Sequence, residues 1–207
     1  MSRASSLQNR EQYHHSQMAA LAGADLPGQA QALGLDIDDQ GRVPVRFFDR
    51  DYLVSNTAVE SLDGAPVPLD HQSILAHYLM SRGRGGLSGE FLPIGRLTGV
   101  VSTDASPSDS LIAPLTANFG DRYDLFVRAA RQIGGQAGGR APSGGEAWLF
   151  PILPFFPVRV IFFEADDEFP AEVKVLFDSS APSFVAYECL ELMELVLVEE
   201  LLSAAGL

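Results

Sequence analysis

The last third of the chain carries the clearest pattern of apolar residues. Residues 158–164 are densely apolar and predict a strand, residues 173–177 predict a second, and residues 147–150 a shorter one. The polar stretch 165–171 between the first two has the length of a hairpin connection. Residues 183–203 then predict a long helix that is apolar on nearly all sides.

Weaker patterns precede this region. Alternating apolar and polar residues predict paired strands over 43–48 and 52–56, and the Asp63-Gly64 turn follows them, as in a small antiparallel meander. In the helix expected over 69–81, Asp70 is placed to cap the first turn. Residues 7–22 predict an N-terminal helix, and residues 111–119 and 123–133 predict two helices or one bent helix.

Two connections are predicted to lack regular structure. Residues 23–34 look like a turn-rich link after a loosely attached N-terminal helix. Residues 134–145 are rich in glycine and look like a flexible loop, which is either a lid over a pocket or a surface linker.

The order of these elements indicates the fold class. Strands come in clusters and do not alternate singly with helices, which favours an α+β fold over a doubly wound parallel sheet. We therefore expect a mainly antiparallel sheet packed by helices, with a long hydrophobic C-terminal helix. Residues 1–25 are expected to be an N-terminal helical extension, and residues 26–207 a single α+β domain.

Composition excludes several classes of partner. The formal net charge is -13, with 14 Lys and Arg against 27 Asp and Glu, and Lys174 is the only lysine. Binding to nucleic acid or to an anionic membrane surface needs a basic stripe, which the sequence lacks. One cysteine, Cys189, allows no disulfide within the chain, and no run of apolar residues is long enough to span a bilayer. These features favour a cytoplasmic protein.

Few residues suggest chemistry. The consecutive acids Asp166, Asp167 and Glu168 lie in the expected hairpin connection, where carboxylates can hold a hard cation or transfer protons, although acids at a hairpin tip are usually only solvated. His77 lies beside the apolar stripe of its helix and is either a packing residue or a proton carrier. We find no phosphate-binding loop and no metal-ligand spacing, and the sequence indicates no cofactor.

Several segments together resemble a known family. They include the residues 74–79 (Ile-Leu-Ala-His-Tyr-Leu), 87–91 (Leu-Ser-Gly-Glu-Phe), 150–158 (Phe-Pro-Ile-Leu-Pro-Phe-Phe-Pro-Val), 163–172 with its Asp-Glu-Phe-Pro-Ala element, and 176–178 (Leu-Phe-Asp). Over roughly residues 30–205 the chain resembles the domain-of-unknown-function 3786 family. The resemblance implies a relative of proteins from anaerobic bacteria and archaea, some of which carry an iron–sulfur type of cysteine-rich segment. It transfers no catalytic residue.

Several residues of the 163–178 segment can be explained by structural roles without a functional site. Pro170 suits the entry to a strand, because it cannot donate a ladder hydrogen bond, and Phe169 is expected to fold back into the core. Asp178 suits the turn that leads into the final helix.

The sequence is compatible with three hypotheses of function. The first is a non-catalytic small-molecule-binding or accessory protein, with prolines and aromatic residues of 150–163 lining an apolar pocket. The second is a carboxylate-based enzyme, with or without a divalent metal, in which His77 and the acids at 166–168 converge on one cleft. The third is an interaction module, such as a homodimer, that acts through the C-terminal helix.

Overall fold

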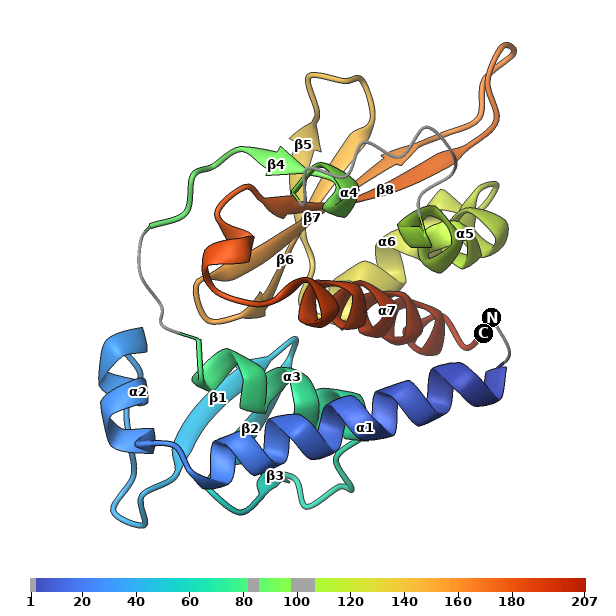
Figure 1. The fold of residues 1–207 in the computed structure, drawn as a ribbon. Helices are drawn as coiled ribbons and strands as arrows, with labels where there is room; N and C mark the ends of the chain where they lie inside the picture. The colour runs from blue at the N-terminus through green and yellow to red at the C-terminus, as the bar shows by residue number, and fades with distance from the viewer. Residues whose placement is uncertain (1–2, 82–85, 98–106) are drawn as a thin grey trace.

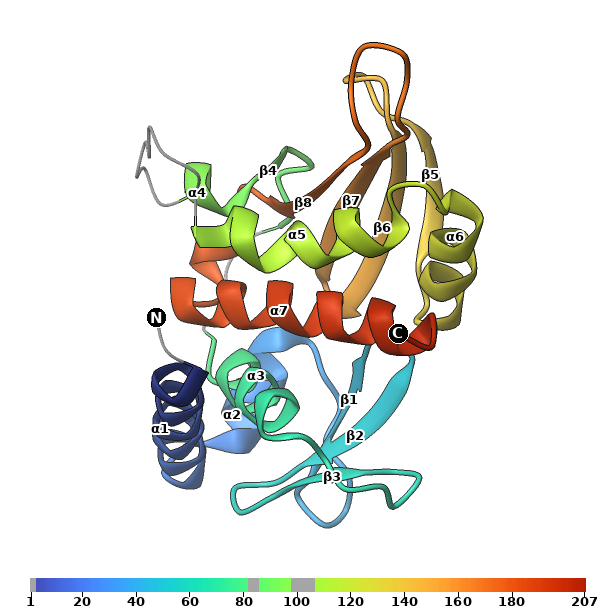
Figure 2. The ribbon, with the colours of Figure 1, turned by 90° about the vertical axis from the view of Figure 1, so that its right-hand side faces the viewer.

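The protein is built around one central helix, α7 (Tyr187–Ala204), which runs between two antiparallel sheets (Figures 1 and 2). The computed structural model describes residues 3–81, 86–97 and 107–207. The N-terminal helices and a three-stranded sheet lie on one side of α7, and a five-stranded sheet with three further helices lies on the other. The fold is therefore α+β with antiparallel sheets, as the sequence predicted, although the strands form two sheets.

The smaller sheet is the meander expected from the sequence. Its strands β1 (Val43–Phe47), β2 (Arg50–Val54) and β3 (Val59–Ser61) pair in chain order. Helix α3 (Leu69–Leu79) follows, and α1 (Arg3–Ala22) lies alongside it. The alternation of apolar and polar residues in β1 corresponds to alternating burial, because Val43, Val45 and Phe47 are buried while the residues between them are exposed.

The larger sheet has the strand order β4-β8-β7-β6-β5. It contains the hairpin predicted in the last third of the chain, formed by β7 and β8, and the short strand predicted over 147–150 is part of β6, which pairs with β7. Helices α5 and α6 cover the face of this sheet that looks toward α7 (Figure 2). The elements of this half are β4 (Phe91–Leu92), α4 (Ile94–Leu97), α5 (Pro107–Phe119), α6 (Tyr123–Gln132), β5 (Gln136–Arg140), β6 (Glu146–Leu153), β7 (Phe156–Phe163), β8 (Glu172–Asp178) and a 3-10 turn (Ala181–Ser183).

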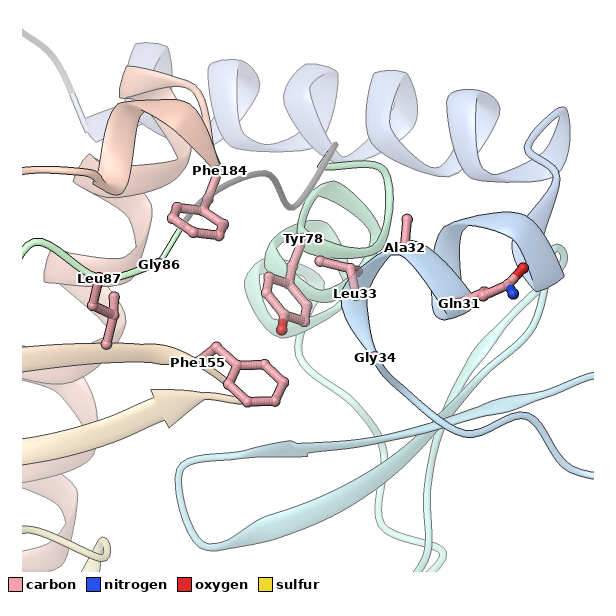
Figure 3. Close-up of a pocket in the computed structure, with 9 residues that line it drawn as sticks. All are labelled: Gln31, Ala32, Leu33, Gly34, Tyr78, Gly86, Leu87, Phe155 and Phe184. Atoms are coloured by element: carbon pink, nitrogen blue, oxygen red, sulfur yellow. The ribbon is translucent and has the colours of Figure 1, made fainter.

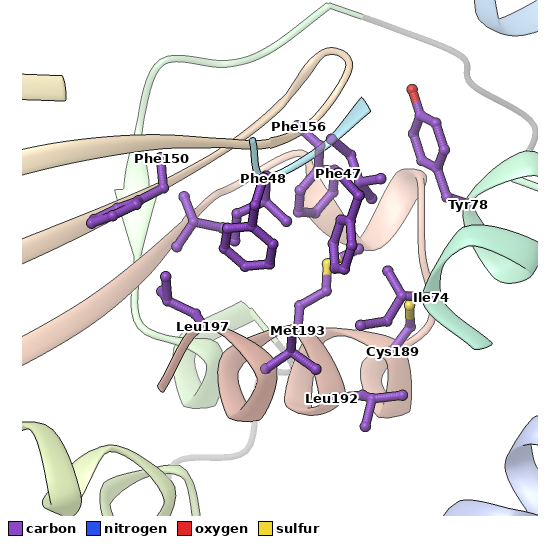
Figure 4. Packing of buried hydrophobic residues seen from close by; sticks show 14 of the residues in the cluster. Phe47, Phe48, Ile74, Tyr78, Phe150, Phe156, Cys189, Leu192, Met193 and Leu197 are labelled. Atoms are coloured by element: carbon purple, nitrogen blue, oxygen red, sulfur yellow. The ribbon is translucent and has the colours of Figure 1, made fainter. Parts of the chain in front are cut away.

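Helix α7 is apolar on most sides because the chain itself covers it on two sides. It contacts α3 on one side and α5 and α6 on the other. Met193 and Leu197 reach the cluster that also contains Phe47, Phe48 and Phe150 (Figure 4). The hydrophobicity of α7 is thus explained by its place in the core, and it gives no separate support to the interaction-module hypothesis.

The prediction for residues 23–34 was wrong, because most of them form helix α2 (Leu26–Leu33). The Asp25 side chain accepts a hydrogen bond from the Gly28 amide at 3.3 Å and so caps the helix. Pro27 lies in the first turn, where its missing N–H has no helical partner to lose. Gly34 ends the helix in a left-handed conformation at φ 68°. Asp25, Pro27 and Gly34, which are also typical of turns, therefore mark the start and the end of a short helix here.

The flexible loop predicted over 134–145 was also wrong. Residues 136–140 form β5, which pairs with β6 and has a bulge between Ala137 and Gly139. All five β5 residues are exposed, so the strand shows no apolar alternation in the sequence. The lid hypothesis for this segment therefore fails, since paired backbone holds it.

Two smaller expectations also need correction. Helix α3 begins after Pro68, and the Asp70 side chain does not cap it; it pairs instead with Arg10 of α1. This pair and the fully buried side chain of Leu21 tie α1 to the rest of the fold, so the helix is not loosely attached.

Residue 135, where α6 leads into β5, lies so close to neighbouring atoms that only a glycine fits there. A Cβ at this position would lie 2.6 Å from a ring carbon of Phe150 and 2.7 Å from the Ala130 carbonyl oxygen. We expect Gly135→Ala to lower the free energy of unfolding by about 2 kcal/mol, measured by urea denaturation. Gly23→Ala is the control, because a Cβ there meets only a carbonyl oxygen at 3.9 Å. Equal stability of the two variants would contradict the close packing of this turn.

Candidate functional site

An apolar cleft opens where the two halves of the fold meet beside α2 (Figure 3). Its volume is about 540 Å³, within the range of about 300–1,000 Å³ that is typical of small-molecule sites. Segments far apart in the chain form its wall: the C-terminal end of α2, helix α3, the segment before β4, the β6–β7 turn and the segment before α7. The lining residues are Gln31, Ala32, Leu33, Gly34, Tyr78, Gly86, Leu87, Phe155 and Phe184.

The wall is aromatic and aliphatic, with one phenol. Tyr78 donates its hydroxyl hydrogen to the Pro154 carbonyl oxygen at 2.6 Å, and burial raises the pKa of this phenol. Its oxygen can therefore only accept a further hydrogen bond. Among the residues that the structure describes, none that lines the cleft is charged, and the adjoining C-terminal end of α2 presents partial negative charge.

The β6–β7 turn places one aromatic ring at the mouth of the cleft. Pro154 and Phe155 connect the paired residues Leu153 and Phe156, and Phe155 has φ 60°. Proline at the first central position with a positive φ at the second is the pattern of a type II turn, in which glycine is preferred at the second. The Phe155 side chain is 65% exposed, and Figure 3 shows its ring beside Tyr78 and Leu87.

Asp178 holds two parts of the cleft wall together. It is 3% exposed and accepts five hydrogen bonds of 2.6 to 3.0 Å, from the amides of Ser88, Gly89 and Ser180 and the hydroxyls of Ser88 and Ser180. Burial alone would raise the pKa of this carboxyl, but the hydrogen bonds from Ser180 and Ser88 outweigh it and the pKa is strongly lowered. The ionised carboxylate thereby fixes the segment that carries Leu87.

His77 acts as a connector between three helices. Its Nε2 accepts the amide hydrogen of Ala186 at 3.0 Å, so the neutral ring carries its proton on Nδ1. Nδ1 lies 3.1 Å from the Tyr13 hydroxyl and 3.0 Å from the Gln17 amide oxygen. Burial lowers the pKa of the imidazole, with Glu188 acting in the opposite direction. This arrangement fixes the start of α7 and leaves neither ring nitrogen without a partner.

The predicted acidic residues lie at the tip of the β7–β8 hairpin, away from α3 (Figure 1). Asp166 accepts the amides of Glu168 and Phe169 at 2.9 and 2.7 Å, and these bonds lower its pKa. A concavity of about 460 Å³ lies on this hairpin, and Asp166 is part of its lining. Phe169 is 66% exposed and does not enter the core, contrary to our expectation.

The structure thus does not bring the sequence candidates together. His77 belongs to the helical layer around α7, whereas Asp166, Asp167 and Glu168 are exposed on the projecting hairpin. Within the described ranges, no group of three or more His, Cys, Asp or Glu side chains is arranged to hold a metal ion. The described helices also include none with the length and apolar character needed to cross a membrane.

Comparison with known proteins assigns the family. Residues 25–200 match the family described as "Domain of unknown function (DUF3786)". The protein belongs to the DUF3786 family. No curated protein and no solved structure is significantly similar to the chain. The cleft lies inside the matched DUF3786 region, and so do His77 and the hairpin acids.

Sequence reasoning did not single out the residues that shape the cleft. Tyr78 is an apolar position of the predicted helix over 69–81 with no separate signal of function, and neither Leu33 nor Phe184 has one. One signal was present in the sequence at Pro154-Phe155. These are the two central residues of the turn between β6 and β7, and a phenylalanine occupies the second position, where glycine is preferred. The expectation that aromatic residues of 150–163 line a pocket matches Phe155, whereas Phe150 and Phe156 are buried.

Proposed function

We propose that this DUF3786 protein is a non-catalytic binding protein for a neutral, largely apolar small molecule, which occupies the cleft at the β6–β7 turn. The observation that carries the proposal is the wall itself. Three aromatic rings, from Tyr78, Phe155 and Phe184, and the side chains of Leu33 and Leu87 make most of the wall apolar, and the Tyr78 oxygen and the Gln31 side chain are its polar side-chain groups. Binding sites for small organic molecules have this combination of apolar walls and few polar groups.

The polar features of the cleft narrow the class of ligand. The Tyr78 hydroxyl already donates a hydrogen bond to the Pro154 carbonyl oxygen. A ligand that hydrogen-bonds to the Tyr78 oxygen must therefore be the donor. The C-terminal end of α2 and the formal net charge of -13 both disfavour an anion. A planar molecule with an N–H or O–H group and no negative charge fits these conditions.

A titration with 1-N-phenylnaphthylamine tests this proposal, because that dye is neutral and aromatic and carries one N–H donor. We expect its fluorescence to rise on binding, with saturation at one site and a Kd in the micromolar range. The sulfonated relative 8-anilinonaphthalene-1-sulfonate should bind about tenfold more weakly, since its charge is unfavourable beside the α2 terminus.

Matched variants locate the bound dye. Ala32 is exposed and lines the cleft, so Ala32→Trp should fill the space without disturbing the core and abolish saturable binding. Leu62 is 60% exposed and does not line the cleft, so Leu62→Trp should bind as the wild type does. Loss of binding in both variants, or in neither, would count against the cleft as the site.

A further inference from the structure

Two phenylalanines of this chain have left-handed backbone conformations, Phe48 at φ 53° and Phe155 at φ 60°. This region of backbone space is costly for a residue with a Cβ, by roughly 1–2 kcal/mol. Such a conformation is kept only where the surroundings or the function offset its cost. The two residues differ in what offsets it.

The strain at Phe48 is offset by packing. Its side chain is 4% exposed, and its ring lies 4.7 Å from that of Phe47 in an edge-on arrangement. Its amide donates to the Ile152 carbonyl oxygen at 2.9 Å, which joins the end of β1 to β6. Burial of a phenylalanine stabilises a fold by about 1.5–3 kcal/mol, more than the backbone costs. Phe48 is therefore explained by folding.

Folding does not explain Phe155 in the same way. Its side chain is 65% exposed, so little apolar area is removed from water. The turn itself is fixed by other groups, since Pro154 sets its first position and the Pro154 carbonyl accepts the Tyr78 hydroxyl at 2.6 Å. At the second position of this turn, glycine or asparagine would satisfy the backbone better.

We infer that Phe155 is a ligand-contacting residue, whose ring is held over the cleft against the preference of its own backbone so that it stacks on a planar ligand. This inference rests on the proposed function and names the residue that gives the site its selectivity for flat, aromatic molecules. The ring is at the mouth, with Leu87 and Tyr78 nearby, so a bound planar molecule would lie between it and the cleft wall (Figure 3). Stacking of aromatic rings adds about 0.5–1.5 kcal/mol beyond the area buried.

The inference predicts opposite signs for stability and binding at this position. Phe155→Gly and Phe155→Asn should each raise Tm, by about 3 °C for glycine, because they relieve the backbone. Both should weaken binding of 1-N-phenylnaphthylamine about tenfold. The asparagine variant keeps a side chain that tolerates the left-handed conformation, so weaker binding there reflects the missing ring and not a loosened turn. Phe48→Gly is the structural control and should lower Tm by roughly 10 °C.

The outcomes separate this inference from the proposed function. If Phe155→Gly lowers Tm, the ring is structural and the inference is wrong, whatever the dye does. If both Phe155 variants bind the dye as tightly as the wild type, while Ala32→Trp abolishes binding, the cleft is the site but Phe155 does not select the ligand. If the wild type does not bind the dye, the proposed function and the inference fail together.

Discussion

Replacing Asp178 with alanine is expected to lower the free energy of unfolding by about 4 kcal/mol. The carboxylate is 3% exposed and accepts five hydrogen bonds, three of them from backbone amides. Alanine would leave these donors without a buried acceptor, and each unsatisfied group costs about 1–3 kcal/mol, less where water reaches it. Urea denaturation followed by fluorescence of Trp148, the only tryptophan, measures the change.

A milder pair of variants isolates the role of the charge. Asp178→Asn replaces one accepting oxygen with a donor, and we expect a loss of about 2 kcal/mol because Oδ2 accepts the Gly89 amide and Oδ1 accepts the other four hydrogen bonds. Asp166→Asn makes the same chemical change at an exposed turn, where asparagine serves equally well, and should cost less than about 0.5 kcal/mol. Equal losses in the two variants would show that Asp178 is not the anchor of the segment with Leu87.

Stability is expected to fall as the pH is lowered from about 6.5 toward 4, and His71 accounts for much of this loss. The ring is 4% exposed; burial and then the charge of Arg50 lower its pKa from 6.5 to about 4. Its Nδ1 lies 3.0 Å from the Tyr52 hydroxyl and its Nε2 3.4 Å from Glu200. Glu200 alone would favour the protonated ring, but Arg50 pairs with both of its oxygens at 2.9 and 3.0 Å.

The direction of this change in stability with pH follows from the difference in proton binding between the native and unfolded states. Between pH 4 and 6.5 the unfolded chain binds a proton at His71 that the native protein does not, so protonation favours unfolding. The stabilising effect is complete above the unfolded pKa and is lost as the pH falls through the native pKa. A shift of this size corresponds to about 3 kcal/mol.

Variants measure the share of this pH dependence that belongs to His71. We expect His71→Gln to reduce the dependence of the free energy of unfolding on pH in this window, since glutamine does not titrate; part of the slope remains because burial also lowers the pKa of His77. His15→Gln, at an exposed position of α1, should keep the wild-type slope. Urea denaturation at closely spaced pH values measures both. An unchanged slope in His71→Gln would contradict the account of the buried ring.

Elements with their own local pattern could be predicted from the sequence, and the exceptions have physical causes. The β6, β7 and β8 strands are rich in aromatic and β-branched residues that face the core, so their pattern is visible in the chain. Strand β5 consists of Gln, Ala, two Gly and Arg, all exposed, and is held only by backbone pairing with β6. Helix α2 contains a proline and a glycine in its first turn, which resemble breakers unless the Asp25 cap is recognised.

The candidate site was less predictable than the fold, because contacts between distant segments create it. Asp178 meets Ser88 across 90 positions, and Tyr78 meets Pro154 across 76. No local pattern contains such pairings. The sequence favoured His77 and the acids at 166–168 because these residue types often carry chemistry, but His77 is engaged in joining helices and Asp166 in shaping an exposed turn.

The most direct test of the proposed function is to map 1-N-phenylnaphthylamine on the protein by NMR of labelled leucine methyl groups. Leu33 and Leu87 line the cleft, whereas Leu62 and Leu207 are exposed elsewhere. We predict that the methyl signals of Leu33 and Leu87 shift together and saturate with one Kd, while those of Leu62 and Leu207 stay in place. Shifts at Leu62 or Leu207 of equal size, or no saturable shift at Leu33 and Leu87, would contradict binding in the cleft.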